Sequence, residues 1–138
     1  MSQRRADAAV AVALFAAGLL LGCATDAEAR RPGSAAVKEV QTGSASYYGA
    51  KFNGRRTASG EPYDPKKMTA AHKTLPMGTR IRVTRTSHGK EGPTVEVRVN
   101  DRCGCTHGRI VDLSLTAAKR LGMLQSGVVP VRIDVLGK

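Results

Sequence analysis

The carboxyl group of Asp101 stands out because it continues an alternation of apolar residues. Val95, Val97 and Val99 alternate with polar neighbours, and the next position of the same phase is Asp101. Such a period-two pattern is typical of a half-buried β-strand, so it predicts a carboxyl group on the apolar face at a strand end. Burial raises the pKa of a carboxyl group and can keep a general acid protonated near neutral pH. The pattern is equally compatible with a structural role, in which Asp101 pairs with Arg102 or accepts backbone N–H groups.

Two further residues could contribute to acid–base chemistry or to substrate positioning. His72 precedes the turn at residues 75–78, and a histidine can donate or accept a proton near neutral pH. A single histidine is nevertheless more often structural. Glu61 follows the polar segment 57–60, where a solvated carboxylate is the ordinary expectation. Local pattern alone therefore assigns neither residue a catalytic role.

A short cysteine-containing segment follows Asp101 directly. Cys103, Cys105 and His107 offer three soft or borderline metal ligands, but no fourth partner for a zinc site is evident. In an oxidising compartment two thiols usually pair, and Gly104 allows the sharp bend that a Cys-x-Cys disulfide needs. The sequence favours this disulfide and leaves free thiols and a metal site as alternatives. Its expected role is to shape the turn after Asp101.

The N-terminal segment has the features of an export signal. An apolar run at residues 8–22 follows Arg4 and Arg5 and ends in small residues. The run of about 15 residues is shorter than the roughly 20 that a helix needs to cross the bilayer core. We therefore expect residues 1–22 to be a signal peptide and the protein to act outside the cytoplasm.

The end of this segment resembles a bacterial lipobox. Residues 19–24 read LLLGCA, which would make Cys23 the lipidated first residue of the mature chain. Ala24 at the next position is similar to sequences sorted to the outer membrane of Gram-negative bacteria. The expected location is thus the cell envelope, on the outer membrane facing the periplasm, or on the cell membrane of a Gram-positive host. The alternative is an ordinary cleaved signal peptide with an incidental cysteine.

The remaining chain is long enough for one domain. Residues 23–42 show no sustained period and contain Pro32, Gly33 and Ser34, so they predict a flexible tether. The folded domain is then expected over residues 43–138, which is sufficient for a small barrel or sandwich. No feature of the sequence indicates an oligomer, and we expect a monomer.

The charge balance indicates a polyanionic partner. The formal net charge is +11, and a surface of this kind attracts anions. Basic residues do not form a stripe interleaved with aromatic residues, so nucleic acid is not the expected partner. Outside the cytoplasm the abundant anions are cell-wall carboxylates, phosphates and anionic lipids. The alternative is that the charge only keeps the domain soluble.

The elements that must position these residues are mostly strands. Period-two alternation predicts strands at residues 79–84, 94–99 and 129–135, with weaker candidates at 43–49 and 109–113. One helix is expected at residues 114–121, because Ser114 is a suitable N-cap and Gly122 a suitable end. Many short strands, one short helix and glycine-rich turns favour a small closed β-barrel.

Several sequence blocks, in order, resemble those of the rare lipoprotein A family of bacterial septal lytic transglycosylases. The blocks are residues 43–49, 52–61, 69–76, 78–80, 99–102 and 108–114. The resemblance implies a mainly β fold, a six-stranded double-psi β-barrel with one or two short helices, which expansins share. It also implies cleavage of peptidoglycan between N-acetylmuramic acid and N-acetylglucosamine, leaving a 1,6-anhydro end. Glycan strands without stem peptides would be preferred, and no cofactor would be needed.

The resemblance also assigns roles to individual residues. It implies a catalytic group of Asp101, His72 and Glu61, in which Asp101 donates a proton to the glycosidic oxygen. It further implies substrate binding by Tyr47, Tyr48, Thr57, Ser59 and Arg102.

Three departures from the family pattern keep a second function open. Tyr47 stands where the family usually has Trp, and residues 103–105 replace a Gly-Pro-aromatic segment. The sequence to Lys138 holds no C-terminal domain of the kind that binds denuded glycans, so septal targeting is not expected. The alternative function is a non-catalytic, expansin-like module that binds wall glycans. His72 and Glu61 together favour the enzyme.

Overall fold

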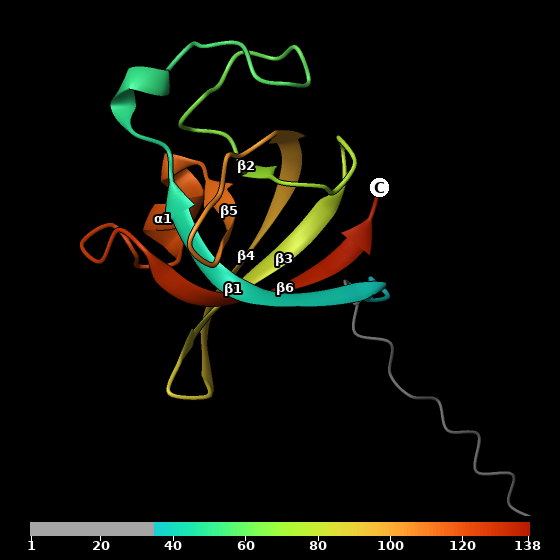
Figure 1. Cartoon of the computed structure of the whole chain (residues 1–138), viewed down its shortest axis with the longest axis vertical. Helices are drawn as coiled ribbons and strands as arrows, with labels where there is room; N and C mark the ends of the chain where they lie inside the picture. Colours follow the sequence, from blue (N-terminus) through green and yellow to red (C-terminus); the bar gives the residue numbers. More distant parts are fainter. Residues whose placement is uncertain (1–34) are drawn as a thin grey trace, which may run out of the picture. The chain divides into compact units, whose positions relative to one another are not determined.

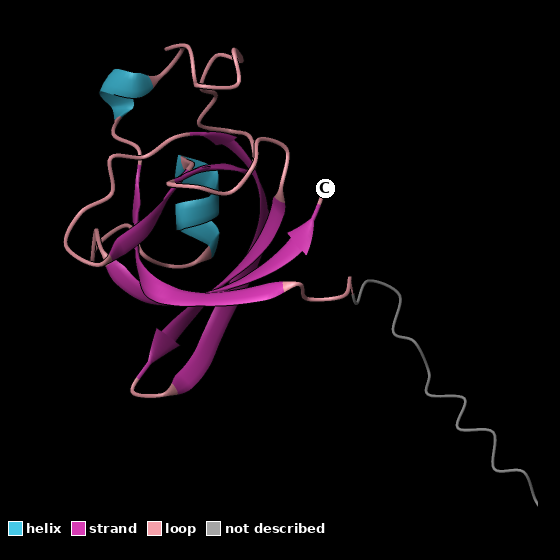
Figure 2. Cartoon of the chain, turned by 45° about the vertical axis from the view of Figure 1, so that its right-hand side comes forward, coloured by secondary structure: helices cyan, strands magenta, loops and turns pink. Residues whose placement is uncertain are grey.

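The computed structural model describes residues 35–138, which are shown in Figures 1 and 2. The predicted signal peptide, the lipidated Cys23 and the first part of the predicted tether lie outside the described residues. Within residues 35–138, no helix has the length and apolar character needed to cross a membrane.

Six strands close into a barrel, which confirms the mainly β architecture. The strands are β1 (Glu39–Tyr47), β2 (Thr69–His72), β3 (Arg80–Ser87), β4 (Lys90–Asp101), β5 (Arg109–Leu113) and β6 (Val129–Gly137). Their order around the barrel is β1-β5-β2-β4-β3-β6. The pairs β1–β5 and β2–β4 are parallel, and the other four are antiparallel. The described helices are a 3-10 helix, η1 (Ala50–Phe52), and α1 (Leu115–Arg120).

The alternation read from the sequence sets the inward face of the long strands. The core contains the valines and isoleucines of the predicted phases: Ile81, Val83, Val95, Val97, Val99, Val129, Val131, Ile133 and Val135. Each is at most 6% exposed. Burial of this apolar surface is the main favourable contribution to folding.

Helix α1 forms as its capping signals predict. The side chain of Ser114 accepts a hydrogen bond from the backbone N–H of Ala117 at 3.4 Å. Lys119 and Arg120 lie in the last turn, where positive charge complements the helix dipole. Ala117 and Ala118 are fully buried and pack into the barrel core, beside which α1 is visible in Figure 2.

Several elements differ from the sequence expectation. Strand β1 begins at Glu39, so the last four residues of the predicted 23–42 tether belong to the barrel. Strands β3 and β4 extend beyond the predicted ranges and meet in a hairpin around His88 and Gly89, which both have positive φ. Strand β2 was not predicted, because its four residues are all buried and show no alternation.

The most consequential difference is a bulge in β4 just before Asp101. In the parallel pair β2–β4, Ala70 lies opposite Val99 but Ala71 lies opposite Asp101, so Asn100 is the extra residue. A bulge of one residue interrupts the alternation of a strand. Asn100 is therefore buried, and Asp101 is only half-buried rather than part of the apolar face. The expectation that Asp101 simply continues the buried apolar face of this strand was therefore wrong, whereas its place at the strand end was correct.

Candidate active site

A cavity of about 480 Å³ lies at one end of the barrel, beside Asp101. Its walls come from the end of β1, the long connection 48–68, and the segments around the end of β4 and in β5. Figure 1 shows this connection in green above the barrel end, opposite the β3–β4 hairpin. The lining residues are Ser46, Tyr47, Tyr48, Phe52, Arg55, Arg56, Thr57, Tyr63, Asp101, Arg102, Cys103, Gly104, Arg109 and Asp112.

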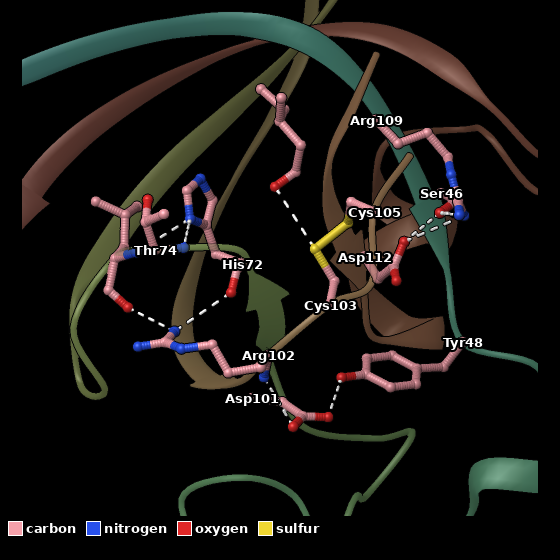
Figure 3. The surroundings of a disulfide bond; sticks show 12 residues. Ser46, Tyr48, His72, Thr74, Asp101, Arg102, Cys103, Cys105, Arg109 and Asp112 are labelled. Atoms are coloured by element: carbon pink, nitrogen blue, oxygen red, sulfur yellow. Dashed lines mark hydrogen bonds and ion pairs between the residues drawn. A yellow bond between two sulfur atoms is a disulfide. The ribbon is translucent and has the colours of Figure 1, made fainter. Parts of the chain in front are cut away.

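Three hydrogen bonds fix the carboxyl group of Asp101. Tyr48 Oη donates to Oδ2 at 2.7 Å, and the backbone N–H groups of Ala58 and Arg102 both donate to Oδ1 at 2.8 Å. Figure 3 shows the Tyr48 and Arg102 contacts. The carboxyl group is thus held between the end of β1 and the connection 48–68, and faces a solvent-accessible cleft.

Tyr48 belongs to an aromatic cluster on the cavity wall. Its ring stacks on Tyr63 with 4.3 Å between centroids and meets Phe52 edge-on at 5.7 Å. Burial, reinforced by the hydrogen bond to Asp101 and the charge of that group, raises the pKa of Tyr48 far above its ordinary value. The hydroxyl group therefore remains a hydrogen-bond donor to Asp101 throughout the physiological pH range. Aromatic faces of this kind also suit stacking on sugar rings.

His72 does not line the cleft, although its carbonyl oxygen contacts Arg102, which does. Its side chain is 3% exposed, and burial, together with the charge of Arg102, lowers its pKa. Nδ1 accepts hydrogen bonds from the N–H groups of Thr74 at 3.1 Å and Leu75 at 3.2 Å. This assigns the proton to Nε2, which donates to Oε1 of Gln41 at 2.9 Å.

The link between His72 and Asp101 passes through Arg102. The guanidinium group of Arg102 donates to the carbonyl oxygen of Leu75 at 2.7 Å and to that of His72 at 3.3 Å, as Figure 3 shows. The turn stabilised by the His72 ring therefore supplies the carbonyl groups that hold Arg102. In this geometry His72 is connected to Asp101 through the neighbouring residue Arg102.

Glu61 is also outside the cavity wall. It forms a two-bond ion pair with Arg98, at 2.6 and 2.9 Å, and Arg98 lowers the pKa of its carboxyl group. The side chains of Glu61 and Arg98 are 35% and 41% exposed, so solvent screens the pair. Thr57 donates to the carbonyl oxygen of Glu61 at 2.7 Å and contacts the hydroxyl group of Ser59 at 2.9 Å. This network shapes the loop that delivers the Ala58 N–H to Asp101.

The structure brings together some of the sequence-predicted site residues and not others. Of the predicted catalytic and substrate-binding residues, five line the cavity: Tyr47, Tyr48, Thr57, Asp101 and Arg102. The hydroxyl group of Tyr47 is bonded to the carbonyl oxygen of Leu124 at 2.9 Å. His72, Glu61 and Ser59 are absent from the lining. His72 contacts Arg102, Glu61 pairs with Arg98, and Ser59 contacts Thr57.

Sequence reasoning missed a polar cluster on the opposite wall. Arg109 donates to Ser46 Oγ at 2.8 Å and lies 3.6 Å from Oδ1 of Asp112, to which the Ser46 hydroxyl group also donates. All three residues line the cavity. Arg109 and Asp112 lie within the 108–114 block of the family resemblance, and their presence in an otherwise apolar strand was the available signal.

Cys103 and Cys105 are joined by a disulfide beside this cluster, as Figure 3 shows. Cys105 is 2% exposed, whereas Cys103 lines the cavity. Within the described residues, the two sulfur atoms and a carboxylate oxygen of Asp112 form a group with the spacing of metal ligands. Sulfur atoms that are bonded to each other are not available as thiolate ligands, so this group fits a disulfide rather than a metal centre.

Curated relatives share most of the barrel. A protein of Nostoc sp. named probable endolytic peptidoglycan transglycosylase RlpA is 56% identical over 98 residues, covering 70% of this chain and 26% of the relative. The endolytic peptidoglycan transglycosylase RlpA of Campylobacter jejuni is 46% identical over 106 residues, covering 77% of this chain and 38% of the relative. The chain thus spans only about a quarter to two-fifths of the length of such relatives.

Solved structures and a family model give the same fold. A Streptomyces papain inhibitor matches with a TM-score of 0.55 and 26% identity, covering 72% of this chain and 96% of that one. An expansin of Clavibacter michiganensis in complex with cellohexaose matches with a TM-score of 0.53 and 27% identity, covering 70% of this chain and 50% of that one. Residues 40–133 match the family model described as lytic transglycolase. The chain therefore belongs to the lytic transglycolase family, as a double-psi β-barrel of the rare lipoprotein A type.

Proposed function

We propose that this protein is an endolytic lytic transglycosylase of peptidoglycan. It cleaves the bond between N-acetylmuramic acid and N-acetylglucosamine, leaves a 1,6-anhydro end, and prefers strands without stem peptides. It acts in the cell envelope, held to a membrane by a lipid on Cys23. The observation that carries the proposal is a fixed carboxyl group, Asp101, in an aromatic-walled cleft. The names of the relatives support it.

The reaction needs a proton donor for the glycosidic oxygen and a base, or the same carboxylate afterwards, to accept the proton of the C6 hydroxyl group; in this proposal Asp101 fills both roles. Asp101 in its protonated form donates to the glycosidic oxygen as the bond to C1 of the muramic acid residue breaks. The C6 hydroxyl group of the same sugar then attacks C1, and its proton goes to the Asp101 carboxylate. Because the attacking group is part of the substrate, the step has little entropic cost. Water activation by a second carboxylate, which glycoside hydrolysis needs, is not required.

The other residues of the predicted catalytic group act as positioning residues in this proposal. His72 holds the turn whose carbonyl oxygens bind Arg102, next to Asp101. Glu61 and Arg98 stabilise the loop from which the Ala58 N–H reaches Asp101. Asp112, on the opposite wall, is a second carboxyl group within the cleft. The half-buried Tyr48 and Phe52 provide aromatic surface for the glycan, and the buried ring of Tyr63 supports Tyr48.

The proposal is tested by product analysis with the purified full chain in detergent. Intact and amidase-stripped peptidoglycan are incubated with wild type and Asp101→Asn, and the soluble products are identified by mass spectrometry. We expect anhydro ends from wild type, more of them from stripped strands, and none above buffer from Asp101→Asn. Asp64→Asn, in a turn outside the cleft lining, serves as the matched control and should retain activity. Equal amounts of anhydro product from wild type and Asp101→Asn would refute the proposed enzymatic function.

A second function is favoured by the likeness to an expansin crystallised with cellohexaose. In this case the barrel binds wall glycans without cleaving them. Wild type would then release no anhydro ends while sedimenting with purified wall. Hydrated reducing ends would instead indicate a hydrolase, which would need a carboxylate that activates water.

A further inference from the structure

The cleft contains more positive than negative charge. Four arginines line it, Arg55, Arg56, Arg102 and Arg109, against the carboxyl groups of Asp101 and Asp112. Two of these arginines are already bound by the protein. Arg109 contacts Ser46 and Asp112, and Arg102 donates to backbone carbonyl groups.

The other two, Arg55 and Arg56, remain available to a ligand. Among residues 35–138, neither guanidinium group forms an ion pair or a side-chain hydrogen bond. Arg55 lies 5.8 Å from the centroid of the Phe52 ring, on the aromatic side of the cleft. Both residues are exposed. The cleft therefore offers two cationic groups that an anionic substituent of a bound glycan could reach.

The backbone that carries these two arginines is well fixed. Tyr63 N–H donates to the carbonyl oxygen of Arg55 at 2.7 Å, and Arg56 pairs with Pro62 in an isolated bridge. Two residues after Arg56, the Ala58 N–H donates to Asp101. The arginines are thus held between the aromatic cluster and the carboxyl group, so a sugar bound for cleavage would pass beside them.

The proposed substrate carries one carboxyl group close to the cleaved bond. Muramic acid bears a lactyl ether on C3, in the same ring as the C1 atom that is attacked. This group ends in a carboxylate when no stem peptide is attached and in a neutral amide when one is. A guanidinium group binds a carboxylate through two parallel hydrogen bonds, an interaction that an amide cannot reproduce.

We propose that Arg55 and Arg56 form a subsite for the lactyl carboxylate of peptide-free muramic acid, and that they determine the preference for such strands. The inference rests on the proposed function for the identity of the glycan. It concerns binding, however, and holds even for a barrel that does not cleave. Because both arginines are exposed, their effect weakens as the salt concentration rises.

Binding is measured with the full chain carrying Asp101→Asn, so that no substrate is consumed. The ligands are amidase-stripped glycan oligomers, the same oligomers with each lactyl carboxylate converted to a methylamide, and peptide-bearing oligomers. We expect the stripped oligomers to bind about tenfold more tightly than the methylamides at low salt, since charge-assisted hydrogen bonds are the stronger kind. Peptide-bearing oligomers should bind like the methylamides.

Two double variants separate the subsite from overall charge. Arg55→Gln with Arg56→Gln should remove the difference between carboxylate and methylamide. Lys119→Gln with Arg120→Gln changes the net charge equally, at the exposed end of α1, and should preserve it. Unfolding curves check that each variant is folded, and Arg56→Gln alone gives a milder second test.

Three outcomes would overturn the inference. They are equal binding of stripped and methylamide oligomers by the parent, equal weakening of both ligands in the Arg55/Arg56 variant, and tight binding of peptide-bearing oligomers. The last would mean that stem-peptide carboxylates are recognised instead. The product assay with unmodified Asp101 is independent of these results, so the subsite and the transglycosylase can fail separately.

Discussion

Tyr48 donates a 2.7 Å hydrogen bond to Asp101 although 53 residues separate them in the chain. The bond joins the end of the first strand to the end of the fourth across the mouth of the barrel. Because burial and the neighbouring Asp101 raise the pKa of Tyr48, its hydroxyl group stays protonated near neutral pH and the donor is present. The orientation of the carboxyl group is therefore a property of the folded barrel and does not depend on bound substrate.

Tyr48→Phe should lower the rate of anhydro-product formation by about tenfold to a hundredfold, because it removes one of three hydrogen bonds that orient Asp101 and such a bond to a charged group contributes about 1.5–3 kcal/mol. The ring still stacks on Tyr63, so substrate affinity should change little. Tyr47→Phe is the control, since the Tyr47 hydroxyl group contacts Leu124 rather than Asp101. The measurement is kcat and KM on stripped glycan. A loss confined to KM would contradict a role in orienting Asp101.

Glu61→Gln and Arg98→Gln should have the same modest effect, and the double variant should be no worse than either single variant. The two side chains form one half-exposed ion pair, whose contribution to stability is about 1 kcal/mol or less. The measurements are product formation and urea unfolding of all three variants. If Glu61→Gln abolishes activity while Arg98→Gln retains it, Glu61 touches the substrate, as the family resemblance implies.

His72 should make the fold sensitive to mild acid. Burial and Arg102 lower the pKa of His72 in the folded chain, with a smaller opposing effect of Glu39 and a further lowering by Lys73. The unfolded chain, with a histidine pKa of about 6.5, therefore binds the proton at higher pH. The stabilisation is complete above about pH 6.5 and is lost as the pH falls through the lower folded-state value.

The measurement is Tm at pH 7.5 and pH 5 for wild type and His72→Gln. Wild type should lose more Tm over this interval than His72→Gln, which has no proton to bind. His88→Gln, at the tip of the exposed β3–β4 hairpin, should follow wild type. An equal loss of Tm in wild type and His72→Gln would show that the buried ring does not control stability in acid.

Removal of the disulfide should leave a folded but less active chain. Closing so short a loop stabilises by about 1.6 kcal/mol in the entropy model, out of a total of about 5–15 kcal/mol. Cys103→Ser with Cys105→Ser should therefore lower Tm by about 10 °C and preserve cooperative unfolding. Product formation at 20 °C should fall, because the segment after Arg102 forms a wall of the cleft. A chain already unfolded at 20 °C would contradict this.

The barrel could be predicted where strands have one buried face. The alternation of Val129, Val131 and Ile133 gave both the strand and its inward side. Strand β2 lacks this signal, because its residues are buried on both sides and a run of four is too short to recognise. Asn100 shows a second limit, since a single extra residue breaks the alternation from which the burial of Asp101 was inferred.

The site could be predicted only in part, because some of its contacts join residues that are far apart in the sequence. Asp101 and Tyr48 were expected there, and both line the cleft. The partners that give them their environment come from elsewhere in the chain: Tyr63 stacks on Tyr48, and the Ala58 N–H reaches across to Asp101. No local pattern encodes such pairings. His72 and Glu61 remain predicted members of the catalytic group; in the structure they lie outside the cleft lining and contact Arg102 and Arg98, respectively.

Strand β1 is paired along both edges, antiparallel to β6 and parallel to β5, and it ends at the cleft. A pull on Glu39 that is resisted by a polymer gripped at Tyr48 is directed along this strand. Because Glu39 and Tyr48 lie at the two ends of one continuous segment, the load passes along the covalent backbone of β1, which the ladders to β5 and β6 hold in place. For a glycan held in the cleft as proposed, β1 would therefore carry tension directly between Glu39 and the binding site.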